Sequence, residues 1–148
     1  MSLTDSDRQL HICVDFLLPR ISPNISAKLR DLNADMLADY LNYLDGMTHC
    51  PADWLIIPGH DWPYYGGGAR ARQLCDHHVA RLDHLLHMTG TTPISTNDAM
   101  LALFTFDMTG HEIFFASCEA RAHLNHLVTQ GRLQHVDAKN GVTLFAKC

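Results

Sequence analysis

The sequence lacks any apolar stretch close to the roughly 20 residues that a transmembrane helix needs, and it has no recognisable secretory signal. Basic residues are also scarce. Eleven Lys and Arg stand against sixteen Asp and Glu, which gives a net charge of −5. We therefore expect a soluble cytoplasmic protein with no membrane contact. The acidic balance also argues against a nucleic-acid partner, because phosphate binding favours a basic surface.

Cysteine usage excludes two further classes. The five cysteines are odd in number and widely scattered, and no Cys-x-x-Cys pair occurs, so a zinc ribbon or a thiol redox motif is disfavoured. Free thiols in a reducing compartment are the expected state. With 148 residues, 47% of them hydrophobic, the chain can bury one good core or two small ones.

Two short apolar runs end in residues that can bind a metal. Residues 55–57 (Leu-Ile-Ile) are followed by Pro58-Gly59-His60, which predicts a strand that breaks and is followed at once by a histidine. Residues 10–14 precede Asp15 in the same way. An α/β sheet gathers ligands at the carboxyl edge of its strands, so Asp15 and His60 are predicted to approach one another.

The segment between these runs predicts one helix. From residue 34 to residue 47, apolar side chains recur at steps of three and four, and Asn33 is in position to cap the first turn. Strand, helix and strand then form a βαβ-like unit.

These motifs, with the Leu-Leu-Pro-Arg-Ile-Ser-Pro-Asn block at residues 17–24, resemble the metallo-β-lactamase superfamily, the zinc hydrolases that include glyoxalase II. The resemblance implies one or two zinc ions, with Asp15 as the bridging ligand and His60 as a late ligand. Asp61 would either hydrogen-bond to a metal ligand and orient it, or be a turn residue. Tyr64 and Tyr65 are candidates for the mouth of a substrate cleft.

The departures from this family are equally informative. The family's main metal motif, His-x-His-x-Asp-His, does not occur, and its nearest imitation is Asp76-His77-His78. Val14 stands where the family has Gly, and Phe16 stands where it has His. We therefore expect the C-terminal fragment of a larger hydrolase. Because catalytic zinc sites use about three protein ligands, the fragment alone is expected to be inactive.

The predicted fold is α+β, in two parts. Residues 1–68 would form the C-terminal portion of an αββα sandwich, with Gly66–Gly68 as a linker. Within residues 69–148, the sequence predicts a first helix over 69–88 and a second helix that begins with a capping box of Ser95 and Asp98. A third helix is predicted over 111–130, ending at Gly131, and a hairpin is predicted around Asn140-Gly141. This order is typical of a winged helix, which the resembled branch also carries.

The eleven histidines invite metal sites, but a solvated surface is the favoured interpretation. His77, His78, His84 and His87 fall on one predicted helix, where alternation with Asp76, Arg81 and Asp83 indicates an exposed face. His111 is expected to start a helix, and His123 and His126 are expected on a polar face. A DNA-reading helix would offer Arg121, His123, Asn125 and His126, with Arg132 and Lys139 on the wing. It lacks the Lys/Arg surplus such readers bring.

The functional prediction is a zinc-dependent hydrolase that uses metal-activated water on a small-molecule ester, thioester or lactam, or on a phosphodiester. The alternative is a non-catalytic winged-helix module for interaction or nucleic-acid binding. Half a sandwich leaves apolar sheet surface uncovered, at a cost of about 25 cal/mol per Å². Self-association into a dimer, or domain swapping, is therefore also expected.

Overall fold

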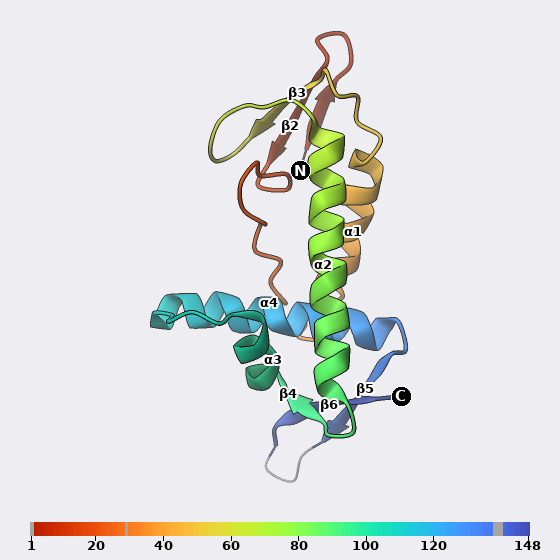
Figure 1. Ribbon diagram of the computed structural model, residues 1–148, viewed down its shortest axis with the longest axis vertical. Coiled ribbons are helices and arrows are strands. Elements are labelled where there is room, and N and C mark those ends of the chain that lie inside the picture. The colour runs from red at the N-terminus through yellow and green to blue at the C-terminus, as the bar shows by residue number, and fades with distance from the viewer. Residues whose placement is uncertain (1, 29, 138–140) are drawn as a thin grey trace. The chain divides into compact units, whose positions relative to one another are not determined.

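A computed structural model describes residues 2–28, 30–137 and 141–148, apart from the side chain of residue 137. The chain forms two compact units (Figure 1). Unit 1 comprises Met1–Pro23 and Tyr40–His78, and unit 2 comprises Asn24–Asp39 and Val79–Cys148. Helices α1 (Met36–Met47) and α2 (Gly67–Thr89) contribute residues to both units. Within the described ranges, no helix is long and apolar enough to cross a membrane.

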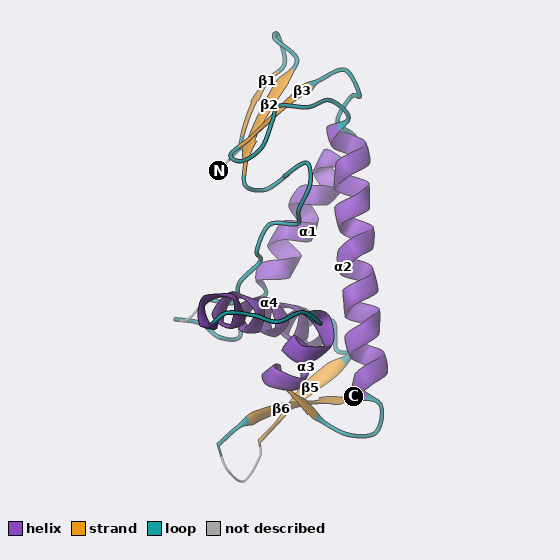
Figure 2. Ribbon diagram, turned by 60° about the vertical axis from the view of Figure 1, so that its left-hand side comes forward, coloured by secondary structure: helices purple, strands orange, loops and turns teal. Residues whose placement is uncertain are grey.

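Unit 1 contains a small mixed sheet, drawn in orange in Figure 2. Its strands are β1 (Leu3–Asp5), β2 (Leu10–Val14) and β3 (Leu55–Pro58), in the order β1-β2-β3. β1 pairs with β2 in antiparallel fashion, whereas β2 and β3 run parallel, with Leu10 opposite Leu55. The predicted strand, helix and strand are therefore confirmed as two parallel strands joined through α1.

The core of unit 1 includes residues of this sheet and of α1. Leu44 and Ile56 are fully buried, and a buried histidine on β2 joins three elements. His11 Nδ1 lies 2.9 Å from Thr4 Oγ1 on β1, and its Nε2 lies 3.1 Å from the Tyr43 hydroxyl on α1. Burial lowers the pKa of His11, which keeps its ring neutral at physiological pH.

The predicted cap of α1 is wrong. The helix begins at Met36, and the Asp35 carboxylate accepts a hydrogen bond of 3.0 Å from the Ala38 amide, as an N-cap side chain does. The Asn33 side chain instead accepts a hydrogen bond from Arg121 of α4 (Gly110–Thr129). An acidic residue two positions further along therefore took the role predicted for Asn33.

The glycines predicted as a linker also behave differently. Gly67 and Gly68 form the first turn of α2, and each is needed for close packing. A Cβ on Gly67 would lie 2.6 Å from Ile56 Cδ1, and one on Gly68 would lie 2.8 Å from the Thr48 carbonyl oxygen. The glycines thus let a helix start against β3 and the preceding turn. The division into domains at residue 68 stays a prediction.

Unit 2 combines helices with a second small sheet. After α2 come β4 (Ile94–Ser95), α3 (Thr96–Leu103), α4, β5 (Leu133–Asp137) and β6 (Thr143–Lys147), with sheet order β4-β6-β5. The capping box of Ser95 and Asp98 and the hairpin are both confirmed. Asn140, predicted for the hairpin turn, and Lys139, predicted for the wing, lie outside the described residues.

Helix α4 has the ends that its sequence encodes. Thr109 and Glu112 form a second capping box, which the sequence reading missed. At the other end, Gly131 adopts a φ of 68°, and its amide and that of Arg132 bond back to Val128 and Leu127. These two bonds form a Schellman motif, so Gly131 ends α4 as predicted.

The polar side of α4 is buried, contrary to prediction. His123, Asn125 and His126 are all inaccessible or nearly so. Asn125 donates hydrogen bonds to the carbonyls of Leu32 and Ala34, at 2.7 and 3.2 Å. His126 Nδ1 lies 3.0 Å from the Asp35 carboxylate. This side of α4 therefore holds the irregular segment that precedes α1.

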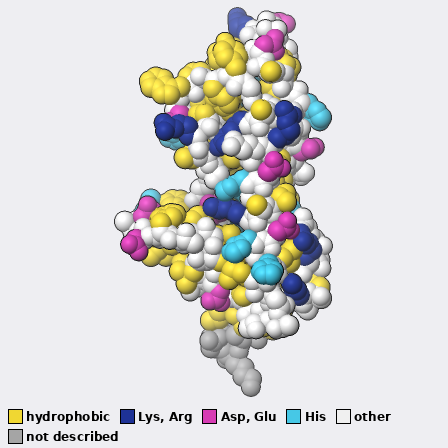
Figure 3. All heavy atoms as spheres, in the orientation of Figure 1, with side chains coloured by type: hydrophobic (Ala, Val, Ile, Leu, Met, Phe, Trp, Pro, Cys, Tyr) yellow, Lys and Arg dark blue, Asp and Glu magenta, His cyan; other side chains and the backbone are white. Residues whose placement is uncertain are grey.

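A second burial contradicts the predicted solvated face of α2. Arg81 pairs with Glu119 of α4, and their side chains are only 18% and 8% exposed. The Arg81 guanidinium also lies 4.8 Å from the centre of the Phe104 ring. Burial raises the pKa of Glu119 and Arg81 opposes that rise. His78 is buried as well, whereas His84 and His87 are exposed, and histidine side chains are visible over α2 in Figure 3.

Removing one partner of the buried ion pair should destabilise unit 2 strongly. Arg81→Ala leaves the Glu119 carboxylate buried without its counter-charge, and we expect a loss of about 3–5 kcal/mol in the free energy of unfolding. Arg132→Ala is the matched control, because Arg132 pairs with Asp83 at the surface and should cost about 0–1 kcal/mol. Urea unfolding followed by far-UV circular dichroism measures both. Equal losses in the two variants would contradict the assignment.

The neutral His11 should make unit 1 sensitive to acid. Its pKa in the folded state is below the ordinary value of 6.5, so the unfolded chain binds the proton more readily. Stability is fully present above about pH 6.5 and falls as the pH drops below it, by at most about 1.4 kcal/mol per pH unit. His11→Gln should flatten this dependence, and His49→Gln, at an exposed position, should not. Both tryptophans, Trp54 and Trp62, lie in unit 1, so their fluorescence during urea unfolding reports the difference.

Candidate functional site

Asp15 and His60 lie together at the edge of the first sheet. They follow β2 and β3, two adjacent parallel strands, and so emerge at the same carboxyl edge. His60 Nε2 lies 3.4 Å from Asp15 Oδ1, and the two side chains are 72% and 59% exposed. The structure thus brings together the two residues that the sequence singled out. Their role as metal ligands stays a prediction.

The backbone at this edge is unusual. Val14 and Asp61 have φ values of 49° and 64°, and positive φ is uncommon for any residue with a side chain and rarest for a β-branched one. The Gly59 amide donates a 2.7 Å hydrogen bond to the Val14 carbonyl. A Cβ on Gly59 would lie 2.7 Å from Asp15 Oδ1 and 3.3 Å from the Val14 carbonyl carbon, so a larger residue there would displace the Asp15 side chain.

The chain after Asp15 is fixed by side chains from three places. The Tyr40 hydroxyl, on α1, donates to the Phe16 carbonyl at 3.0 Å, and the Tyr64 hydroxyl donates to the Leu17 carbonyl at 2.9 Å. Arg70, on α2, donates from Nε to the Leu18 carbonyl and from Nη2 to the Ile21 carbonyl, at 2.7 and 2.8 Å. These four bonds satisfy the carbonyls of a segment without secondary structure. The loop that carries Asp15 is therefore held rigidly.

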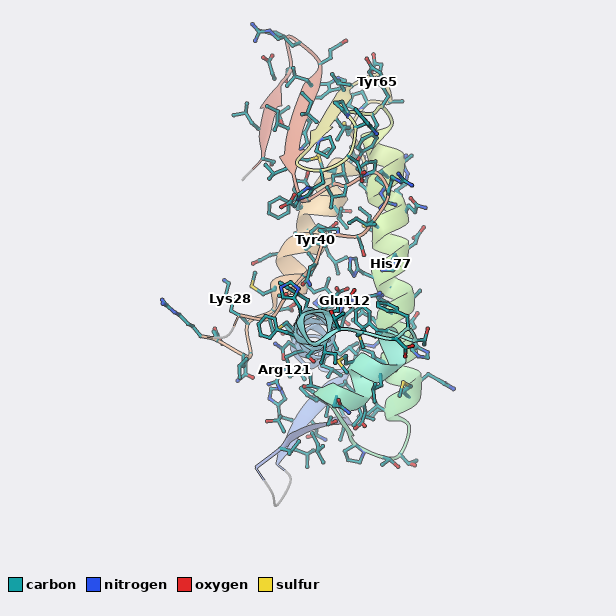
Figure 4. All side chains as sticks on the ribbon, turned by 90° about the vertical axis from the view of Figure 1, so that its left-hand side faces the viewer. Lys28, Tyr40, Tyr65, His77, Glu112 and Arg121 are labelled. Carbon is teal, nitrogen blue, oxygen red and sulfur yellow. The ribbon has the colours of Figure 1, made fainter. Side chains whose placement is uncertain are left out.

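Tyr64 and Tyr65 have different environments. The hydroxyl of Tyr64 is engaged with the loop, and burial raises its pKa above the ordinary value. Its backbone also pairs with Ile56, which closes the loop that carries His60. Tyr65 is exposed and lies just before α2 (Figure 4). Tyr65 is 66% exposed and Tyr64 is partly buried, and a position at a cleft mouth stays a prediction for both.

Asp61 has the conformation of a turn residue. It is exposed, its φ is positive, and aspartate tolerates that region better than most residues. Within residues 2–28, 30–137 and 141–148, no hydrogen bond joins its side chain to Asp15 or His60. Its backbone conformation favours the interpretation as a turn residue over that of a residue that hydrogen-bonds to a metal ligand.

The Asp15–His60 pair has the spacing of two ligands on one metal. With bonds of about 2.0–2.1 Å and tetrahedral angles, two donors on zinc lie about 3.3 Å apart, close to the 3.4 Å observed. A carboxylate oxygen and an imidazole nitrogen are also donors that zinc accepts. The described part of the chain contains no group of three or more His, Cys, Asp or Glu side chains placed to hold a metal. The pair therefore fits part of a zinc site and cannot complete one alone.

Comparison with known proteins points to one family. Residues 82–148 match the family model of the metallo-β-lactamase-like C-terminal domain. Among solved structures, a β-lactamase domain protein from Burkholderia ambifaria is 34% identical over 94% of this chain, with a TM-score of 0.91. A metallo-β-lactamase family protein from Thermus thermophilus is 26% identical over 96% of it, with a TM-score of 0.80. No curated protein matches the chain.

The chain spans 41% and 43% of the lengths of those two solved proteins. Across the described residues, the chain combines helices with two small sheets. This mixed α and β content is consistent with a piece of a metallo-β-lactamase-like fold. The resemblance stated from Asp15 and His60 is confirmed at this level. A glyoxalase II-like branch and a winged helix are not distinguished by these matches.

Relief of the backbone strain beside Asp15 should be measurable. At a φ of 49°, a residue with a Cβ costs roughly 1–2 kcal/mol, so Val14→Gly should be more stable than Val14→Ala by about 1 kcal/mol. The matched pair is Val79→Gly and Val79→Ala. Val79 is exposed inside α2, and there glycine should be the less stable by about 1 kcal/mol. Urea unfolding of the four variants tests the sign, and the same order at both positions would contradict strain at Val14.

Proposed function

We propose that the chain is the C-terminal part of a zinc-dependent hydrolase of the metallo-β-lactamase superfamily. The observation that carries this proposal is the Asp15–His60 pair, 3.4 Å apart at the ends of adjacent parallel strands. It is supported by the match of residues 82–148 and by the two solved metallo-β-lactamase-type structures. A hydrolase is the reaction class that this set of donors serves best.

Each residue at the sheet edge has a definite task in this proposal. Asp15 would hold metal through a carboxylate oxygen and His60 through Nε2. A zinc ion held by these residues would supply hydroxide at neutral pH for the hydrolysis of an ester, thioester, lactam or phosphodiester, because zinc-bound water has a pKa of about 7. The Val14–Gly59 backbone bond and the loop held by Tyr40, Tyr64 and Arg70 would keep Asp15 in position.

Two donors are too few for a catalytic zinc site, so further ligands would come from outside this chain. The chain alone should therefore show little turnover. Completion by a second copy, through self-association or domain swapping, is one source of such ligands. Light scattering of the purified chain distinguishes a dimer from a monomer.

We also propose that the C-terminal residues form a winged helix of the kind found in the glyoxalase II-like branch. The element order α2, β4, α3, α4, β5 and β6 supports this assignment. The alternative function as a nucleic-acid-binding module loses support on α4. His123, Asn125 and His126 are buried, and Asn125 and His126 contact residues 32–35. Packing is therefore the better account of that helix.

Zinc titration of the purified chain tests the metal-binding part of the proposal. We expect weak binding of one equivalent, measured by competition with a chromophoric zinc indicator. Asp15→Asn and His60→Ala should each weaken it by about tenfold or more, because each removes one of two donors. His49→Ala is the matched control, since His49 is an exposed histidine of the same unit and should leave affinity unchanged.

The controls also define failure. Zinc binding that survives His60→Ala, or that falls equally in His49→Ala, would place the metal on surface histidines and contradict the proposal. No zinc binding at all would contradict it too. Turnover of ester or thioester substrates by the chain alone would instead contradict the expectation that ligands are missing.

A further inference from the structure

A small hollow in unit 1 is lined almost entirely by polar and cationic side chains. Its volume is about 170 Å³. The residues around it come from the loop after Asp15 and from the first half of α2, and they are Arg20, Ser22, Arg70, Gln73, Leu74 and His77. Neither Asp15 nor His60 lines the hollow, so it is distinct from the proposed metal site.

The charge in this hollow is not compensated by the protein. No Asp or Glu lines it. None of the ion pairs in the described residues includes Arg20 or Arg70. Two guanidinium groups therefore share one hollow without a counter-ion from the chain. Such a site lowers the energy of an anion that enters it.

Arg70 is already held in place for a ligand. Its Nε and Nη2 donate to the carbonyls of Leu18 and Ile21, and its Nη1 donates to Gln73 Oε1. A guanidinium has five N–H donors, so two remain for another acceptor. Because the three existing bonds fix the plane of the group, little side-chain entropy is lost when a ligand binds.

The loop after Asp15 contributes a second cation and a hydroxyl to the hollow. In the described residues, neither the guanidinium of Arg20 nor the hydroxyl of Ser22 makes a hydrogen bond, and both lie on the loop that Arg70 anchors. His77 is exposed on α2 (Figure 4), and its ring packs edge-on against His78 at 5.2 Å. The hollow thus combines a fixed cation with a free cation and a hydroxyl.

A larger hollow in unit 2 is a weaker candidate for the same role. It has a volume of about 430 Å³ and is lined by Arg132, Lys147 and His87 among others. Asp83 also lines it, 3.5 Å from Arg132, and so supplies an internal counter-charge. The hollow in unit 1 has no such carboxylate.

We propose that the hollow between Arg20 and Arg70 is an anion-binding site for one phosphate or carboxylate group of a ligand. Both groups present the paired oxygens that a guanidinium fork binds through two parallel hydrogen bonds. Ser22 donates a further bond, and Gln73 holds Arg70 in its binding orientation. The site needs no metal, so it stands or falls independently of the zinc proposal.

The test is a titration of the metal-free chain with inorganic phosphate, followed by proton–nitrogen correlation spectra. We expect saturable shifts at Arg20, Ser22, Arg70 and Gln73, with a dissociation constant of about 1 mM. A parallel titration with malonate distinguishes the two chemistries, because the tighter probe identifies phosphate or carboxylate as the preferred group.

Arg20→Gln is the informative variant, because Arg20 is exposed and its replacement should not disturb the fold. It should weaken binding of the preferred probe by about five- to tenfold. Arg72→Gln is the matched control, since Arg72 is an exposed arginine on α2, the helix that carries Arg70, and does not line the hollow. Its affinity should be unchanged.

Two results of the titrations with the native chain and the arginine variants would overturn this site, and a third comes from His60→Ala. One is shifts that do not saturate with either probe, and the other is equal weakening in Arg20→Gln and Arg72→Gln, which would indicate general attraction to positive charge. His60→Ala should bind the probe as the native chain does. If His60→Ala abolishes binding while Arg20→Gln does not, the anion is bound at the sheet edge and the proposed site is wrong.

Discussion

One irregular segment depends on side chains for its hydrogen bonds in each of the two units. Residues 16–28 and 30–35 form no helix or named strand, so their backbone carbonyls need donors from elsewhere. In unit 1, Tyr40, Tyr64 and Arg70 supply these donors to residues 16–21. In unit 2, Asn125 supplies them to residues 32 and 34. A hydrogen bond of this kind contributes about 0.5–1.5 kcal/mol, so these few side chains together favour one conformation of the segment.

The candidate metal ligand depends directly on that constraint. Asp15 stands where an ordered strand passes into the segment, and its side chain is exposed, with His60 Nε2 3.4 Å away. Its orientation comes from the backbone, through the Val14–Gly59 bond on one side and the anchored carbonyls on the other. Arg70 contributes to both candidate sites, since it anchors the loop of Asp15 and lines the hollow between Arg20 and Arg70. The two sites are thus held by one scaffold without sharing a residue that binds a ligand.

What the sequence predicted correctly was local or set by strand order. The capping box at Ser95, the end of α4 at Gly131 and the meeting of Asp15 with His60 follow from short motifs or from parallel strands that share an edge. Some errors were local, such as the cap of α1, which lies at Asp35 and not at Asn33. The larger errors concern partners that are distant in sequence. Asn125 and His126 look like surface residues in a helical pattern, because their partners lie about ninety positions away. Periodicity ranks a side chain by polarity alone, so it cannot recognise polar groups buried with partners.

Two side-chain pairs of this chain, Arg81–Glu119 and Asp15–His60, differ in how much they contribute to stability. Arg81 and Glu119 are buried together, and breaking such a pair leaves a costly lone charge, which makes it a structural tie. Asp15 and His60 are both exposed, so their contact contributes little to stability. That contribution does not offset the roughly 1–2 kcal/mol of strain at Val14 beside it. Strain that persists where the protein gains little stability is typical of functional sites, which supports the proposal that the sheet edge binds a metal.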